Sequence, residues 1–138
     1  MSCPYFDPVN PRVEGAGARH AMLPLGDSWS GICRAVPSEP TRSDNAALQS
    51  CNLGYARGNC GRFPESDGPD AVRFTIAADD SAILRLYYVL ERNHEPFAHG
   101  ALEYSNARDE FASAAEGVLT HRQARAYIES YRRRKAGR

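Results

Sequence analysis

The apolar residues of this 138-residue chain are concentrated after position 70, where most of its long aliphatic and aromatic side chains lie. The first half is instead rich in glycine, proline, serine, asparagine and aspartate. A segment of that composition buries too little apolar surface to form a core alone. Because the length fits one ordinary domain, we predict a single domain, 1–138, in which residues 1–69 form a lobe beside a core supplied by later residues.

Residues 70–105 alternate apolar and polar side chains as half-buried strands do. The segments 71–77, 82–91 and 97–105 are joined by short turns, which predicts a three-stranded antiparallel β-meander. The middle segment is apolar on both faces, so we expect a central strand that is covered on both sides. One face carries Leu84, Leu86, Tyr88 and Leu90, and the other carries Ile83, Tyr87 and Val89.

Residues 106–136 change to a helical period, and two helices are expected there. Phe111 and Val118 stand at the two ends of the first apolar stripe, and Thr120 with Gln123 fits a capping box that would begin the second helix. The predicted fold class is therefore α+β, with a loop-rich, cysteine-bearing N-terminal lobe on the meander and C-terminal helices. The helices would cover one face of the sheet and the cysteine-bearing loops the other.

The first forty residues contain six prolines, each of which removes a backbone donor and restricts the residue before it. We therefore expect irregular backbone over 1–40. The stretch from Thr41 to Asp44 fits a helix start of the capping-box type, so a short helix is expected to lead to Cys51. Residues 52–70 return to glycine, proline and aspartate, which predicts a loop.

All four cysteines lie in this first half: Cys3, Cys33, Cys51 and Cys60, separated by 29, 17 and 8 residues. Cysteines that serve as small core hydrophobes would be expected among the apolar strands instead. Their position where the core is thinnest predicts a cross-linking function. The N-terminus has no secretion-type segment, so we expect a reducing, cytoplasmic compartment, where metal or redox chemistry is more common than stable disulfides.

The residues around the cysteines favour an iron–sulfur cluster as the bound group. Cys3 is followed by Pro4, and a Cys-Pro pair recurs at iron–sulfur ligands. Gly54 and Gly58 lie between the last two cysteines and would let backbone amides approach charged sulfur atoms. We therefore predict one [4Fe-4S] cluster bound through the four cysteines, in a protein of electron transfer or redox sensing.

Zinc is the competing metal, because four thiolates suit its tetrahedral geometry equally well. Zinc sites usually contain closely spaced cysteine pairs, and this chain has no CxxC pair. Disulfides and unrelated thiols are the other interpretations. The alternative to a cluster protein is therefore a structural zinc-binding or disulfide-stapled interaction module with a basic C-terminal tail.

Three stretches of residues 1–64 carry a family resemblance: CPYFDP, LPLGDSWSGICRA and CNLGYARGNCGRFP. They resemble blocks in small, uncharacterised bacterial four-cysteine proteins thought to bind an iron–sulfur cluster. The resemblance implies cluster binding and says nothing of a biological role. It does not extend to the bacterial ferredoxins, because their CxxCxxC run is absent.

Charge is distributed unevenly, with ten acids and four bases in residues 65–110 and seven bases and two acids in 111–138. Arg132, Arg133, Arg134 and Lys135 end the last predicted helix, where cations suit the helix dipole. Such a group can contact phosphates, but no nucleic-acid motif accompanies it. A redox or regulatory protein is therefore the expected partner, and nucleic acid is less favoured.

Membrane and enzyme classes have little support in the sequence. No stretch reaches the roughly 20 apolar residues that a spanning helix needs, so no membrane partner is expected. The sequence GDSWSG at 26–31 superficially resembles serine-hydrolase fragments, but it lacks the preceding strand, the base and the oxyanion hole. It predicts a turn that presents Cys33. Because no acid–base pair or phosphate loop stands out, enzymatic activity is not the favoured interpretation.

Overall fold

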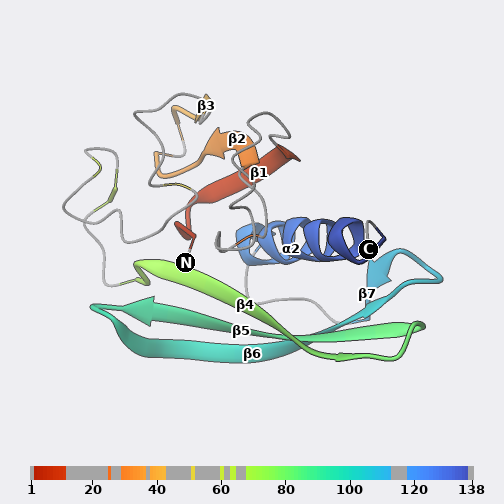
Figure 1. Cartoon of the computed structure of the whole chain (residues 1–138). Coiled ribbons are helices and arrows are strands. Elements are labelled where there is room, and N and C mark those ends of the chain that lie inside the picture. The colour runs from red at the N-terminus through yellow and green to blue at the C-terminus, as the bar shows by residue number, and fades with distance from the viewer. Residues whose placement is uncertain are drawn as a thin grey trace.

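The computed structural model (Figure 1) describes residues 2–11, 25, 29–36, 38–42, 51, 60, 63–64, 68–112 and 118–136. These residues form a three-stranded sheet, a four-stranded sheet and a long C-terminal helix. Both sheets are antiparallel. The broad α+β class is therefore confirmed, while the detailed architecture differs from the prediction in several places.

The predicted meander is present, and each of its strands is longer than predicted or displaced by a few residues. It consists of β4 (Ala71–Asp79), β5 (Ile83–Arg92) and β6 (Glu95–Ser105), paired in sequence order. A short fourth strand, β7 (Glu110–Phe111), pairs with the end of β6, so that Phe111 lies opposite Tyr104. The prediction that placed Phe111 in a helix is therefore wrong.

The turns of the meander follow from local side-chain chemistry. Asp80 closes the β4–β5 turn, because its Oδ1 atom accepts the backbone N–H groups of Ala82 at 3.1 Å and Ile83 at 2.7 Å. Asn93 and His94 join β5 to β6 with φ angles of 54° and 65°. Two successive residues at positive φ match the twist of a two-residue hairpin, which explains why β5 and β6 continue so close to the turn.

The two faces of the meander differ sharply in burial. Leu84, Leu86, Tyr88 and Leu90 are buried as predicted. On the opposite face, Ile83, Tyr87 and Phe97 expose 41%, 50% and 50% of their surface. The expectation that the cysteine-bearing segments cover this second face is wrong. The strands of the N-terminal lobe, β1 (Phe6–Pro11) and β2 (Trp29–Cys33), lie on the same side of the sheet as the helix (Figure 1), and Tyr87 on the other face is half exposed.

The N-terminal lobe contains a sheet where irregular backbone was predicted. Its strands are β1 (Phe6–Pro11), β2 (Trp29–Cys33) and β3 (Thr41–Arg42), in the order β1-β2-β3. β1 tolerates Pro8 and Pro11 because it is an edge strand, and its register shifts between Pro8 and Asn10. Trp29 lies in a strand, not in a turn, and Thr41 begins a strand, not a helix.

Gly31 allows the close approach of β1 and β2. A Cβ atom at this position would lie 2.1 Å from the backbone oxygen of Asp7 and 2.9 Å from the Cα atom of Pro8. Because both neighbours are backbone, a side chain here would push the strands apart. The glycine therefore fixes how closely β1, and with it the Asp7 region, lies against β2.

The C-terminal helix, α2, spans Val118–Ala136. The predicted capping box is wrong, because Thr120 already lies inside the helix and Gln123 is fully buried with partners elsewhere. Residues 113–117, where the first predicted helix would have continued, lie outside the described residues. The basic end of the helix is confirmed, since its last turn carries Arg133, Arg134 and Lys135.

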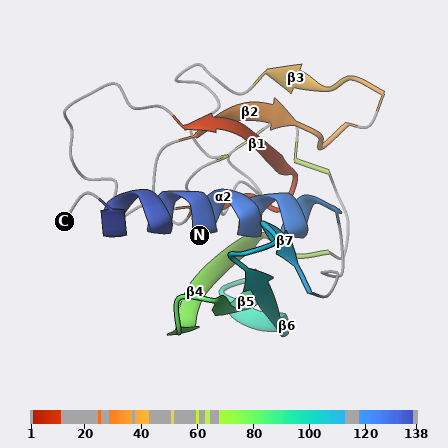
Figure 2. The ribbon, with the colours of Figure 1, turned by 90° about the vertical axis from the view of Figure 1, so that its right-hand side faces the viewer.

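α2 lies between the two sheets, as the perpendicular view shows (Figure 2). Its buried residues include Ala124, Ala126 and Ile128. One hydrophobic cluster contains these together with residues of both sheets. At the edge of the larger sheet, Ser2 exchanges backbone hydrogen bonds with Val72 at 2.7 and 2.8 Å. No helix among the described residues has the length and apolarity that crossing a membrane requires.

Candidate functional site

Cys3 lies in a tight turn at the start of the chain. The backbone N–H of Phe6 donates to the Cys3 carbonyl at 3.1 Å, and Pro4 occupies the second position of the turn, which suits its fixed φ. Within this turn the backbone N–H of Tyr5 donates to the Cys3 sulfur. The local sequence Cys-Pro-Tyr-Phe thus points an amide at the thiol, as expected for a thiolate ligand.

Backbone pairing brings two other cysteines to this turn. The N–H of Cys3 donates to the carbonyl oxygen of Cys51 at 3.0 Å. Cys33 ends β2 and pairs with Phe6 of β1, while the N–H of Arg34 donates to the carbonyl of Tyr5 at 2.9 Å. Cys33 therefore ends a strand, and Cys51 has helical backbone.

Cys60 approaches the same place through a second turn. The N–H of Phe63 donates to the Cys60 carbonyl at 3.1 Å. The ring of Phe63 meets the ring of Tyr5 edge to face, with centroids 5.3 Å apart. The two turns are thus joined by an aromatic contact directly beside their cysteines.

The four thiols are close enough to influence one another electrostatically. Burial raises the pKa of Cys3, the Tyr5 N–H opposes this rise, and the nearby thiols of Cys51, Cys33 and Cys60 add smaller increases, so that the pKa is about 12. Cys3, Cys33 and Cys51 expose only 5–6% of their surface, and Cys60 is half-buried. The structure therefore gathers all four predicted site residues, although they come from four separate segments.

The four cysteines, as the structure describes them, are joined neither by disulfides nor in a metal-type arrangement. All four cysteines are described, and no disulfide joins any of them. Among the described residues, no group of three or more His, Cys, Asp or Glu side chains is arranged to hold a metal ion. The candidate site is thus a group of four thiols.

Gln123 anchors the cysteine turn to α2, and the sequence prediction missed it. Its Nε2 atom donates to the carbonyl oxygens of Cys3 at 2.7 Å and Phe6 at 2.8 Å, and its Oε1 atom accepts the hydroxyl of Ser2 at 2.7 Å. Its side chain is fully buried. The sequence signal for its burial was a polar residue within an apolar helical stripe. The same residue also fitted the last position of a capping box.

Asp7 forms a second link between the lobe and α2. Its carboxylate is 1% exposed and accepts from Arg34 Nε at 2.7 Å and from Arg122 Nη1 at 2.6 Å. Arg34 follows Cys33 directly, so this ion triplet lies beside the second cysteine. Because two guanidinium groups flank one buried carboxylate, the desolvation of Asp7 is offset by two charge-assisted hydrogen bonds.

Aromatic side chains surround this part of the core. Phe6 is fully buried, and Trp29 is 2% exposed and donates from Nε1 to Ser130 Oγ of α2 at 3.3 Å. Tyr5 and Phe63 pack on the core from its edge. The two glycines that the sequence prediction placed beside the cysteines, Gly54 and Gly58, lie outside the described residues.

The basic residues at the end of α2 are part of the folded structure. Lys135 Nζ donates to the carboxylate of Asp79 in β4, which also accepts from the Tyr131 hydroxyl at 2.8 Å. Arg132 donates to the Tyr104 hydroxyl at 3.2 Å. Two of the four predicted phosphate-contacting residues thus bind the protein's own sheet.

Comparison with protein-family models, with curated proteins and with solved structures finds no match to this chain. The family resemblance of residues 1–64 therefore stays a prediction. The functional argument rests on the geometry of the four cysteines and their surroundings.

Proposed function

We propose that the protein binds one [4Fe-4S] cluster through Cys3, Cys33, Cys51 and Cys60 and works in electron transfer or redox sensing. The observation that carries the proposal is the approach of three cysteines, from three distant segments, to the thiol of Cys3. Cys3 and Cys51 belong to the hydrophobic core cluster and Cys60 packs against it, so the proposal depends on all four thiols meeting there and not on burial alone.

If these cysteines bind as thiolates, electrostatics requires a positively charged group among them. Three of the four cysteines are buried, and buried thiolates repel one another strongly where the local dielectric constant is low. A metal-containing group supplies the cations that offset this repulsion. The donor set is all sulfur, which suits iron–sulfur clusters and other thiolate-binding metals.

The choice between a cluster and a single ion depends on the spacing of the four sulfurs. A tetrahedral ion with metal–sulfur bonds of about 2.3 Å would require the sulfurs to lie within about 4 Å of one another. A cluster with several irons holds its thiolates farther apart. The four separate segments can each supply one ligand to such a group.

The chain itself would contribute three things to a bound cluster, which in turn supplies one-electron chemistry. The Tyr5 amide donates to the Cys3 sulfur, and such hydrogen bonds help to set the potential of a cluster. Burial of Cys3, Cys33 and Cys51 excludes water from most of the site. Gln123 holds the Cys3 turn in place through two carbonyl oxygens.

Anaerobic reconstitution with iron and sulfide tests the proposal. We expect brown protein with broad absorption near 400 nm, roughly as thiolate-bound clusters show, that is bleached reversibly by a one-electron reductant. Replacement of each cysteine by serine in turn should greatly weaken or remove this absorption. Ala124→Ser, which places a hydroxyl in the buried face of α2, is the matched control and should leave it unchanged.

Zinc is the competing outcome of the same experiment. A colourless protein that takes up one zinc ion and loses it in the cysteine variants would overturn the cluster and support a structural zinc module. Absorption that survives every cysteine substitution would show adventitious iron and would also contradict the proposal.

A further inference from the structure

One exposed face of α2 carries four arginines at helical spacing: Arg122, Arg125, Arg132 and Arg133. We call this set the arginine face. Residues three, four and seven apart lie on one side of a helix, and Arg122, Arg125 and Arg132 expose 52%, 46% and 48% of their side chains. The face is hollowed on both sides of the helix.

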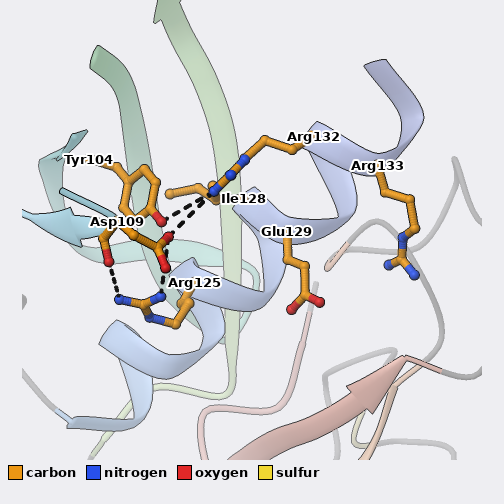
Figure 3. Close-up of a pocket in the computed structure, with 7 residues that line it drawn as sticks. All are labelled: Tyr104, Asp109, Arg125, Ile128, Glu129, Arg132 and Arg133. Atoms are coloured by element: carbon orange, nitrogen blue, oxygen red, sulfur yellow. Dashed lines mark hydrogen bonds and ion pairs between the residues drawn. The ribbon is translucent and has the colours of Figure 1, made fainter. Parts of the chain in front are cut away.

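The larger hollow, of about 600 Å³, lies between α2 and the turn that joins β6 to β7 (Figure 3). Here Asp109 lies 3.8 Å from Arg125 Nη1 and 3.5 Å from Arg132 Nη1, and its carbonyl oxygen accepts from Arg125 at 3.0 Å. Figure 3 shows both arginines reaching towards Asp109, while Glu129 and Arg133 project away from that group. One carboxylate between two guanidinium groups leaves a net positive charge.

The second hollow, of about 330 Å³, lies between α2 and β1. Trp29 and Ala126 line it, and Val9 contributes to its wall with 52% of its surface exposed. Arg122 and Arg125 line the same hollow with Asp7 and Glu129, so its lining charges balance and the net positive charge comes from the larger hollow.

The two hollows adjoin across the helix, because Arg125 and Glu129 line both of them. Their combined surface has a partly apolar centre, an exposed apolar side chain and a rim of guanidinium groups. Protein interfaces are enriched in arginine and in apolar contact of this kind.

We propose that the arginine face is the docking surface for an acidic segment of a partner protein. Carboxylates of the partner would meet the arginines, and an apolar side chain would lie against Val9 and Ala126. The identity of the partner as a redox protein rests on the proposed function: Gln123, on the same helix, hydrogen-bonds to Cys3, so a partner docked here would lie one helix away from the cysteines. The docking itself does not require a cluster.

Charge distribution favours protein over nucleic acid at this surface. Asp109 and Glu129 lie within the larger hollow, where they would repel a continuous phosphate backbone. An acidic protein segment can place its carboxylates individually and leave gaps opposite these two acids. Sequence-independent phosphate binding instead rewards uninterrupted positive charge.

The test compares three fluorescein-labelled probes. The first is a short peptide in which glutamates flank a central phenylalanine, the second is the same peptide with glutamines in place of the glutamates, and the third is a short DNA duplex. Binding to the full chain is measured by fluorescence anisotropy at low and physiological salt. We expect the acidic peptide to bind, with affinity that falls as salt rises. The glutamine peptide should bind at least about tenfold more weakly, because complementary charge drives the encounter.

A matched pair of charge reversals locates the binding surface. Arg125→Glu with Arg133→Glu should weaken acidic-peptide binding at least about tenfold, because like charges then face one another. Arg73→Glu with Arg85→Glu makes the same change in net charge on the exposed face of the larger sheet and should change binding less than about twofold. Thermal unfolding checks that both variants fold.

Three results would overturn this inference: no peptide binding by the wild-type chain, equal weakening by both double variants, or tighter binding of the duplex than of the peptide. The measurement is made on metal-free and on iron-reconstituted protein. If the chain takes up no iron but still binds the peptide through the arginine face, the cluster proposal fails and the docking surface stands.

Discussion

At the scale of single residues, the cysteine turn depends on a side chain from the other end of the sequence. Gln123 uses both polar atoms of its amide, bonding to Cys3, Phe6 and Ser2 inside the core. A buried amide that is fully satisfied stabilises one particular arrangement of its partners. The Cys3 turn is therefore held by α2 as well as by its own backbone.

Replacement of Gln123 by leucine should destabilise the fold by about 2 kcal/mol or more, because it leaves buried polar partners unsatisfied. Chemical denaturation measures the change. Glu129→Leu, at an exposed position of the same helix, should shift the free energy of unfolding by less than about 0.5 kcal/mol. Equal effects of the two substitutions would show that the Gln123 hydrogen bonds contribute little.

The Asp7 ion triplet predicts a non-additive pair of substitutions. Either Arg34→Gln or Arg122→Gln leaves the buried carboxylate with one guanidinium partner. The double variant leaves it with neither, and an unpaired buried charge costs about 3–5 kcal/mol. A double-mutant cycle by chemical denaturation should therefore show a loss larger than the sum of the single losses. Simple additivity would contradict this account of Asp7.

At the scale of elements, the first turns of α2 bind the N-terminal lobe and the last turns of α2 bind β4. Arg122 and Gln123 bind the lobe, whereas Tyr131 and Lys135 both donate to Asp79. The lobe and the sheet are thus joined through the helix as well as through the Ser2 pairing at the sheet edge.

The Asp79 contact predicts a specific acid sensitivity. Hydrogen bonds from Lys135 and then Tyr131 lower the pKa of the Asp79 carboxyl to about 2, from an ordinary value of 3.8. Since the unfolded chain takes up this proton first, the stability from Asp79 is complete above pH 3.8 and is lost as the pH falls towards 2. Asp79→Asn and Lys135→Met should both flatten the pH dependence of unfolding in that interval, measured by chemical denaturation. Glu103→Gln, which removes one partner of a surface ion pair, should show the same dependence of unfolding free energy on pH as the wild-type protein. The same dependence in Asp79→Asn would contradict the Asp79 contact.

The two faces of β5 predict opposite responses to truncation. Leu86 is fully buried, so Leu86→Ala should cost about 2–5 kcal/mol. The neighbouring Tyr87 is half exposed, so Tyr87→Ala should cost less than about 1 kcal/mol. Comparison of their denaturation midpoints tests whether the face with Tyr87 is uncovered; equal losses would mean that something packs on it.

At the scale of the whole molecule, the residues after 70 were the predictable part. Strict alternation made the meander strands and their Leu86 face readable, because a period of two has few other interpretations. The short strand at Phe111 could not be predicted, because the spacing between Phe111 and the apolar residues after it also fits a helix. The assignment of residues 1–138 to one domain stays a prediction.

The N-terminal lobe was mispredicted for a physical reason. Pro8 and Pro11 argue against regular structure within a sheet, yet an edge strand tolerates both because one side makes no ladder hydrogen bonds. Gly31 looked like a turn residue but serves a close strand contact. That the four cysteines form one binding site stays a prediction from the sequence. The roles of Gln123 and Asp7 could not be predicted, because each has a partner more than 100 residues away in the chain.

The central claim is that the gathered cysteines bind a cluster, and metal analysis tests it most directly. Protein purified without oxygen should contain about four irons and about four acid-labile sulfides per chain, as expected for one [4Fe-4S] group, with little zinc. The quadruple cysteine-to-serine variant should contain neither metal above background. One zinc per chain without sulfide, or no metal with all thiols intact, would contradict the account.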